Sequence, residues 1–194
     1  AVIALREQLE DWSTLAELLA RRISVAFDAE KATALRKRLA ALYLGPLERE
    51  EDGVTTLREI LDAAPKDAET ITTLESFYSG RERWNDLRDL LRDRLDRAPE
   101  SETKLALLEQ LSELAETRLE SPEDSLDFAL QMLDVQKTHA QGRARVERLL
   151  AALKRWDDLM MYFETWVKEA EGTDAVEELR LLVKIGEIRE REME

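Results

Sequence analysis

The sequence predicts an all-α fold, an α-solenoid of stacked antiparallel helix pairs, and three observations lead to this prediction. Apolar segments led by tryptophan begin at Trp12, Trp84 and Trp156, 72 residues apart in each case. The chain holds six Gly and four Pro among 194 residues, few for a sheet protein with many turns. At 44% hydrophobic and 37% charged residues, it can bury a long core and cover it with charge. Repetition at one period indicates an array of helical units.

Composition also excludes several classes of protein. The net charge of −14 repels nucleic acid and anionic lipid, so neither is an expected partner. No apolar run approaches the roughly 20 residues that a membrane span needs. The absence of Cys excludes disulfides, thiolate nucleophiles and cysteine metal sites. It permits a reducing compartment, so a cytoplasmic location is favoured but not fixed. The absence of an initiator Met and of a signal-peptide pattern is typical of an excised fragment.

Three helices are expected in the first quarter of the chain. Residues 1–9 have the apolar pattern of the last part of a helix, so the sequence is expected to start within the first helix pair. Over residues 12–27 the apolar positions fall on one helical face. A helix over 28–44 follows, and Gly45-Pro46 stops it. Gly45 is expected to adopt a left-handed cap, and Pro46 cannot continue the helix.

The middle of the chain predicts three further helices. The first covers residues 50–64. Asp67 is expected to be the N-cap of the second, because its carboxylate can accept free backbone N–H groups. The third begins at Trp84. The residues that close these three helices are Pro65, Gly80 and Pro99.

The last part predicts helices that start after Ser101, Ser121 and His139, at Trp156 and near residue 174. Ser101 and Ser121 are expected caps, and Pro122 with acidic residues in the first turn strengthens the second start. About eleven helical segments result, with no linker that divides domains. The whole chain, 1–194, is therefore expected to be one array. Its repeat units are approximately 1–27 (partial), 28–65, 66–99, 100–137, 138–171 and 172–194 (partial).

The unit lengths point to a known family. From Pro65 to Pro99 is 34 residues, and from Pro99 to the matching Lys137 is 38. The 34-residue unit resembles the tetratricopeptide repeat, in which an aromatic residue opens the second helix and Pro ends it. The chain as a whole resembles a degenerate tetratricopeptide variant with a 72-residue double repeat, of the kind found in long bacterial proteins. The residues that carry the resemblance are Ala68, Leu74, Tyr78, Trp84, Leu91 and Pro99.

The resemblance implies a right-handed superhelix whose concave face, lined by the first helix of each pair, binds an extended or helical peptide. A floor of small residues with longer polar residues beside it could admit a peptide backbone. The alternative is that these are ordinary solvated positions. A clamp for a C-terminal carboxylate is not expected, because the only Asn, Asn85, lies on a second helix. The candidate groove residues are Lys31, Ala34, Arg38, Thr72, Ser76, Ala106, Gln110, Ala144 and Arg148.

A second candidate contact lies in the third tryptophan-led helix. Met160 and Met161 replace Ala16 and Glu17 of the first copy and Arg88 and Asp89 of the second, at positions expected to be exposed. Exposed Met suggests a contact with a partner, and the alternative is chance. Trp166 extends the apolar stripe of the same helix and is expected in the core.

Nothing in the sequence predicts catalysis. His139, the only His, stands at a helix start, so a capping role is favoured over acid–base chemistry. There is no phosphate-binding loop and no metal-ligand spacing, so no catalytic, cofactor-binding or metal-binding residue is expected. The expected function is a non-enzymatic scaffold that binds a protein or peptide. The alternative is a structural element whose open ends stack on further repeats or on other copies of itself.

Overall fold

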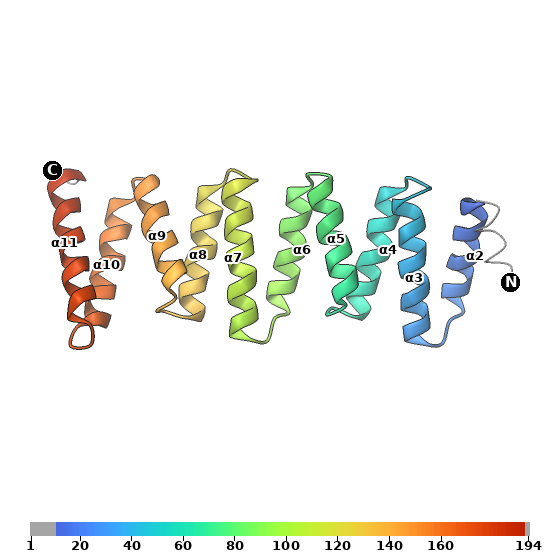
Figure 1. The fold of residues 1–194 in the computed structure, drawn as a ribbon, viewed down its shortest axis with the longest axis horizontal. Coiled ribbons are helices and arrows are strands. Elements are labelled where there is room, and N and C mark those ends of the chain that lie inside the picture. Colours follow the sequence, from blue (N-terminus) through green and yellow to red (C-terminus); the bar gives the residue numbers. More distant parts are fainter. Residues whose placement is uncertain (1–10, 193–194) are drawn as a thin grey trace. The chain divides into compact units, whose positions relative to one another are not determined.

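The computed structural model describes residues 11–192, which form ten α-helices and no strand (Figure 1). The all-α prediction is confirmed, and the helix expected over residues 1–9 lies outside the described residues. None of the ten helices combines the length and the apolar character that crossing a membrane requires. The helices are α2 (Trp12–Ser24), α3 (Ala29–Leu44), α4 (Glu50–Ala63), α5 (Ala68–Gly80), α6 (Trp84–Asp96), α7 (Ser101–Thr117), α8 (Pro122–Val135), α9 (Ala140–Ala152), α10 (Trp156–Ala170) and α11 (Ala175–Glu192).

Three helix starts have the N-caps that their sequences favour. Asp67, Ser121 and His139 each accept a hydrogen bond from the backbone N–H three residues later, at 2.9, 3.4 and 3.1 Å. Each bond satisfies one of the N–H groups that the first turn of a helix leaves without a partner. The Nδ1 atom of His139 is the acceptor at the start of α9, so this side chain has a structural role there.

Three details of the predicted boundaries are wrong. Ser101 is the first residue of α7, and Glu100 takes the N-cap position without a side-chain hydrogen bond. Gly45 has a φ of −102°, so it does not form a left-handed cap. The left-handed residue of that turn is Glu48, with a φ of 52°. Helix α2 stops before Phe27, which is fully exposed, because Phe27 has no apolar neighbour to pack against.

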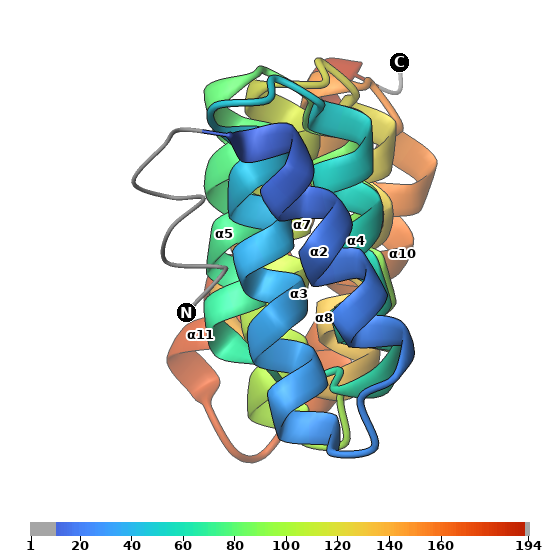
Figure 2. The ribbon, with the colours of Figure 1, turned by 90° about the vertical axis from the view of Figure 1, so that its right-hand side faces the viewer.

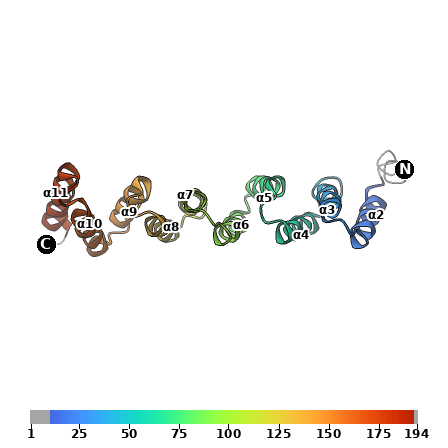
Figure 3. The ribbon, with the colours of Figure 1, turned by 90° about the horizontal axis from the view of Figure 1, so that it is seen from below.

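The chain divides into two compact units, residues 1–87 and 88–194, and the division falls inside α6. In the first unit, α2 packs on α3, α3 on α4, and α4 on α5. Figure 2 views this unit from its α2 end, with α2 beside α3. Figure 3 shows α3 and α5 on one side of the unit and α2 and α4 on the other. The first unit is therefore a two-layer stack of helices.

The second unit has the same construction. Helix α7 packs on α8, α8 on α9, α9 on α10, and α10 on α11. Helices α7, α9 and α11 form one layer of this unit, and α8 and α10 the other (Figure 3). We call α3, α5, α7, α9 and α11 the odd helices. Successive helices run in opposite directions in both units (Figure 1).

Each unit has a core of its own. In the first unit, Leu15 and Leu19 of α2 are fully buried and pack with Leu39 and Leu42 of α3. In the second unit, Phe163 of α10 is 1% exposed and belongs to a cluster contributed by α8, α9, α10 and α11. A single pair of helices cannot bury all of its apolar residues. Stacking on the neighbouring pairs removes the remaining apolar surface from water.

Small residues allow two helix pairs to pack closely. In α7 and α8, the hydroxyl oxygens of Ser112 and Ser125 lie 2.8 Å apart, and both residues are fully buried. In α4, a Cβ added to Gly53 would lie 2.6 Å from side-chain atoms of Leu44 at the end of α3. A larger residue at Gly53 therefore has no room without displacement of α3 or of Leu44.

Gly53→Leu is expected to destabilise the first unit by a net of about 2 kcal/mol. Overpacking costs roughly 1–3 kcal/mol or more, and the better helix propensity of Leu offsets part of it. Gly80→Leu is the matched control, because no heavy atom lies within 4 Å of the Cβ that it would add. The free energy of unfolding, measured with denaturant, should fall for the first variant only. Equal stability of the two variants would contradict the close packing of α3 and α4.

Candidate partner-binding pockets

All the candidate groove residues lie on the odd helices. Their side chains are exposed, except for Arg38, which is partly buried. In the first unit they belong to α3 and α5, and in the second unit to α7 and α9. Their role in binding stays a prediction. The residues are Lys31, Ala34 and Arg38 of α3, Thr72 and Ser76 of α5, Ala106 and Gln110 of α7, and Ala144 and Arg148 of α9.

Two basic residues of this set are already paired within the chain. Lys31 lies 3.2 Å from the carboxylate of Asp28, and Arg148 of α9 donates to Glu116 of α7 at 2.7 Å. The hydrogen bond from Arg148 lowers the pKa of the Glu116 carboxyl, and the same bond raises the pKa of Arg148. The charges of Lys31 and Arg148 are therefore compensated within the chain.

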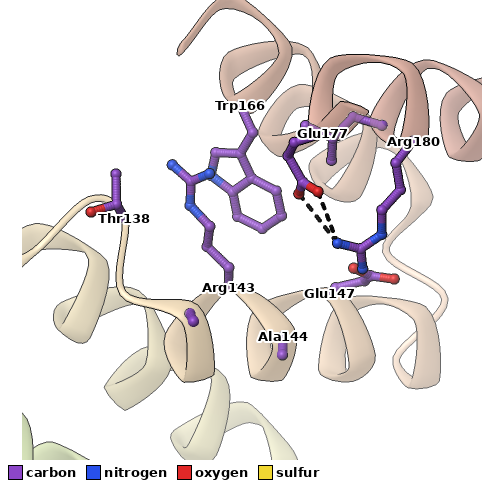
Figure 4. Close-up of a pocket in the computed structure, with 9 residues that line it drawn as sticks. Thr138, Arg143, Ala144, Glu147, Trp166, Glu177 and Arg180 are labelled. Carbon is purple, nitrogen blue, oxygen red and sulfur yellow. Dashed lines mark hydrogen bonds and ion pairs between the residues drawn. The ribbon is translucent and has the colours of Figure 1, made fainter. Parts of the chain in front are cut away.

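A pocket between two odd helices lies in the second unit, between α9 and α11, with α10 behind it (Figure 4). We call it the α9–α11 pocket. Its volume is about 300 Å³. Ala144, one of the candidate groove residues, lies in its wall. The residues that line it are Thr138, Ala140, Arg143, Ala144, Glu147, Trp166, Glu177, Arg180 and Leu181.

Trp166 forms the aromatic wall of the α9–α11 pocket. It is 5% exposed and belongs to the core, as predicted. Its ring centroid lies 5.7 Å from that of Phe163 and 5.9 Å from that of Tyr162. The guanidinium of Arg143 lies over the indole at 5.1 Å, a cation–π contact (Figure 4). These contacts fix the indole, so the wall is rigid before any partner binds.

The acidic and basic side chains of the pocket are paired with one another or with neighbours. Arg143 donates to the carbonyl of Lys137 at 2.9 Å and forms an ion pair with Glu169. Glu147 forms an ion pair with Lys184. At the rim, Arg180 and Glu177 lie 3.0 Å apart (Figure 4). The charged residues of the lining therefore compensate one another or are paired with neighbours. Apart from Thr138, the remaining lining is apolar: Ala140, Ala144, Trp166 and Leu181.

A smaller pocket of about 120 Å³ lies between α3 and α5 of the first unit. We call it the α3–α5 pocket. Lys37 stands at its edge and binds Asp67 at 2.8 Å and Glu69 at 2.7 Å. The hydrogen bond from Lys37 is the main reason that the pKa of Asp67 falls to about 2. The lining residues are Lys37, Ala40, Ala41, Leu44, Leu57, Glu69, Thr70 and Thr73.

Acid should weaken the first unit through Asp67. Because its pKa is depressed from 3.8 to about 2, the stabilisation from its charge is present above the unfolded pKa and is lost as pH falls toward 2. Asp67→Asn removes the charge and keeps an N-cap residue. The variant should be less stable than the wild type by about 1 kcal/mol or less at neutral pH, since the pair is partly exposed, and the difference should vanish near pH 2. A difference in unfolding free energy that is constant with pH would contradict this role.

The expectation that Met160 and Met161 are both exposed is wrong for Met160. Met160 is 7% exposed and packs in the core of the second unit, whereas Met161 is 55% exposed. The matching residue of the first copy, Ala16, is also buried, so this position faces inward in both helices. Met161 matches the exposed Glu17, and its part in a contact stays a prediction.

Sequence reasoning missed most residues of the two pockets. It chose exposed positions of the odd helices, and of these Ala144 lines a pocket but Arg148 does not. Most of the lining residues lie on the flanks of those helices. Arg143 and Glu147 are spaced by four residues on α9, and Lys37 lies on the flank of α3. The sequence does contain one sign of the α9–α11 pocket, because the charged residues Arg143 and Glu147 flank the small, exposed Ala144. In the α9–α11 pocket, the fold brings lining residues together from α9, α10 and α11.

The fold and the pockets define an all-helical array of stacked helix pairs with cavities between its odd helices. No protein-family model matches the chain, and no curated protein sequence matches it. Among solved structures, a mutant of MamA has a TM-score of 0.43 and 16% identity, over 89% of this chain and 90% of that chain. MamA AMB-1 has a TM-score of 0.41 and 16% identity, over 84% of this chain and 90% of that chain. Similarity at this level says nothing about a partner.

Proposed function

We propose that the chain is a non-enzymatic scaffold of the tetratricopeptide-like kind, which binds a peptide or protein partner on its odd helices. The α9–α11 pocket would receive one apolar side chain of that partner. The observation that carries the proposal is a cavity with an aromatic wall whose charged lining is already paired within the chain.

An apolar side chain suits this pocket better than a charged one. A charged group would have to displace an existing ion pair, such as Arg180 with Glu177, or be buried without a partner. An apolar group would cover Ala144, Leu181 and the indole of Trp166 without breaking those pairs. At about 300 Å³ the pocket is at the lower end of the range for ligand sites, which suits one side chain. Such an anchor in a rigid pocket is the usual centre of a binding interface.

The uses of the polar side chains support a binding role over catalysis. The Nδ1 atom of His139 accepts the capping bond of α9, so this side chain already has a structural use at the start of the helix. Ser112 and Ser125 are buried against each other between α7 and α8. In the part of the chain that the structure describes, no group of three or more Asp, Glu or His residues is placed to hold a metal ion.

The 72-residue double repeat is part of the same proposal, with the repeat units given above. Helices α2, α6 and α10 all begin at a tryptophan of the repeat. The starts of α3 and α7, α4 and α8, and α5 and α9 each differ by 72 residues. Left-handed residues recur at the same spacing, at Glu48 and Glu120 and at Glu82 and Lys154. A net charge of −14 supports a protein partner over nucleic acid or a membrane surface, and the absence of Cys supports a cytoplasmic location.

Selection of a displayed random peptide library on the purified chain would test the binding function. Peptides that bind should share one apolar anchor residue, and Ala144→Trp should weaken their binding about tenfold or more, because the new indole fills the pocket. Ala106→Trp is the matched control, an exposed Ala on another odd helix, α7. The pocket proposal fails if the selected peptides bind the Ala144→Trp variant as well as the wild type, or if selection yields no binding peptide.

A second candidate function is an assembly element that associates through an open end of the helical stack. The observation that favours it is the apolar outer face of α11, where Val176, Leu179, Leu182 and Val183 are 81%, 64%, 47% and 53% exposed. Light scattering of the purified chain at increasing concentration would test it. A mass that stays that of one chain would exclude self-association.

A further inference from the structure

The outer face of α11 has the features of a docking surface for another helix. At about 100° per residue, its exposed apolar residues fall on the side of the helix opposite Leu181 and Ile185, which are buried against the core. Gly186 lies in the middle of this face, and no heavy atom lies within 4 Å of a Cβ added there. The face consists of Val176, Leu179, Leu182, Val183 and Gly186.

Gly186 occupies a position that is small in two other odd helices. It is the twelfth residue of α11, as Ala40 is of α3 and Ser112 is of α7. Both of those residues are buried, and both helices pack against the helix that follows them in the chain. At Ser112 the contact with the next helix is direct, through Ser125. By the same construction, Gly186 marks the point where another helix can come closest to α11.

The charges beside this face are arranged to match an antiparallel copy of α11. Glu178 and Arg189 lie on one flank of the face, and Arg180 and Glu187 on the other. The two pairs share one midpoint, between Val183 and Lys184. If two copies of α11 cross there in opposite directions, each Glu178 therefore stands opposite the other copy's Arg189. Arg180 and Glu187 meet in the same way, so all four contacts are between opposite charges.

We infer that the outer face of α11 binds the same face of a second copy of this chain, in an antiparallel, two-fold symmetric helix pair. This rests on the second candidate function and does not require peptide binding in the α9–α11 pocket, although Arg180 lies at the rim of that pocket. A two-fold contact uses one patch twice, so a single self-complementary helix is sufficient for it. Leu179 of one copy then lies near Gly186 of the other, where the missing side chain leaves room. The existing pair of Arg189 with Glu164, at 3.2 Å, is exposed and weak enough to exchange.

Sedimentation equilibrium of the full chain at rising concentration should show a monomer–dimer equilibrium. Gly186→Leu adds bulk at the crossing but meets nothing within a single chain, so it should fold and weaken the dimer about tenfold or more. Arg189→Glu should weaken the dimer by bringing like charges together, and Glu178→Arg combined with Arg189→Glu should restore it. None of these three residues lines the α9–α11 pocket, so peptide binding should be unchanged in these variants.

Cysteine cross-linking would define the symmetry, because the chain has no Cys of its own. Val183→Cys, beside the two-fold axis, should form a disulfide-linked dimer under mild oxidation, whereas Val176→Cys, away from the axis, should not. A measured mass equal to that of one chain at every concentration would overturn the inference. It would mean that the outer face of α11 binds nothing or binds a helix of a different protein. A dimer that is unaffected by Gly186→Leu, or equal cross-linking of the two Cys variants, would overturn it as well.

Discussion

Phe163→Ala is expected to lower the free energy of unfolding of the second unit by about 3–5 kcal/mol, because the substitution leaves a cavity in a close-packed core. Phe163 is 1% exposed and lies in a cluster supplied by four helices. Its ring also contacts Trp166, at 5.7 Å between centroids, and lies 5.6 Å from the ammonium of Lys184. Loss of the ring should therefore loosen both the core and the wall of the α9–α11 pocket.

Phe27→Ala provides the matched control, because Phe27 is fully exposed in the loop after α2. The same chemical change there should alter stability by no more than about 0.5 kcal/mol. Denaturant unfolding followed by tryptophan fluorescence and by circular dichroism would measure both variants. A cost below roughly 1.5 kcal/mol for Phe163→Ala would mean that the four helices are not packed around this ring.

Met160→Glu is the second substitution with a large expected effect. Met160 is 7% exposed, and burial of a carboxylate there without a cation should cost about 3 kcal/mol or more. Met161→Glu, one residue further on, should change stability by no more than about 0.5 kcal/mol, because Met161 is 55% exposed. The comparison tests the orientation of α10 directly. Similar losses for the two variants would contradict it.

Helix positions were largely predictable because their signals are local. Asp67, Ser121 and His139 cap the helices that follow them, and each is visible in the sequence as a polar residue before an apolar stripe. Ser101 shows the limit of such reasoning. A helix start shifted by one residue leaves the same pattern of apolar residues, so the pattern alone cannot choose between Glu100 and Ser101 as the cap.

The inward orientation of Met160 could not be predicted from the matching residues in the other two copies of the repeat. The comparison with Ala16 and Arg88 gave one small apolar and one charged residue, and an Ala fits both a core and a surface. In the structure both Ala16 and Met160 are buried, so the size of the residue at this position differs while its orientation does not.

The pockets could not be predicted because they depend on the distance between helices. Arg143 of α9, Trp166 of α10 and Arg180 of α11 come from three helices, and nothing in any one helix fixes their separation. The sequence placed Trp166 in the core, which is confirmed, but its second role as a pocket wall depends on the gap between α9 and α11. Ala144 was selected as a groove residue and does line the pocket.

The binding role of the α9–α11 pocket is tested most directly by nuclear magnetic resonance of the four indole N–H groups of the chain. A selected peptide with an apolar anchor would be titrated into the isotope-labelled chain. The indole resonance of Trp166 should shift with the binding curve, whereas that of Trp12, in the first unit, should stay in place. A peptide that binds and leaves the Trp166 resonance unchanged would show that the α9–α11 pocket is not the binding site.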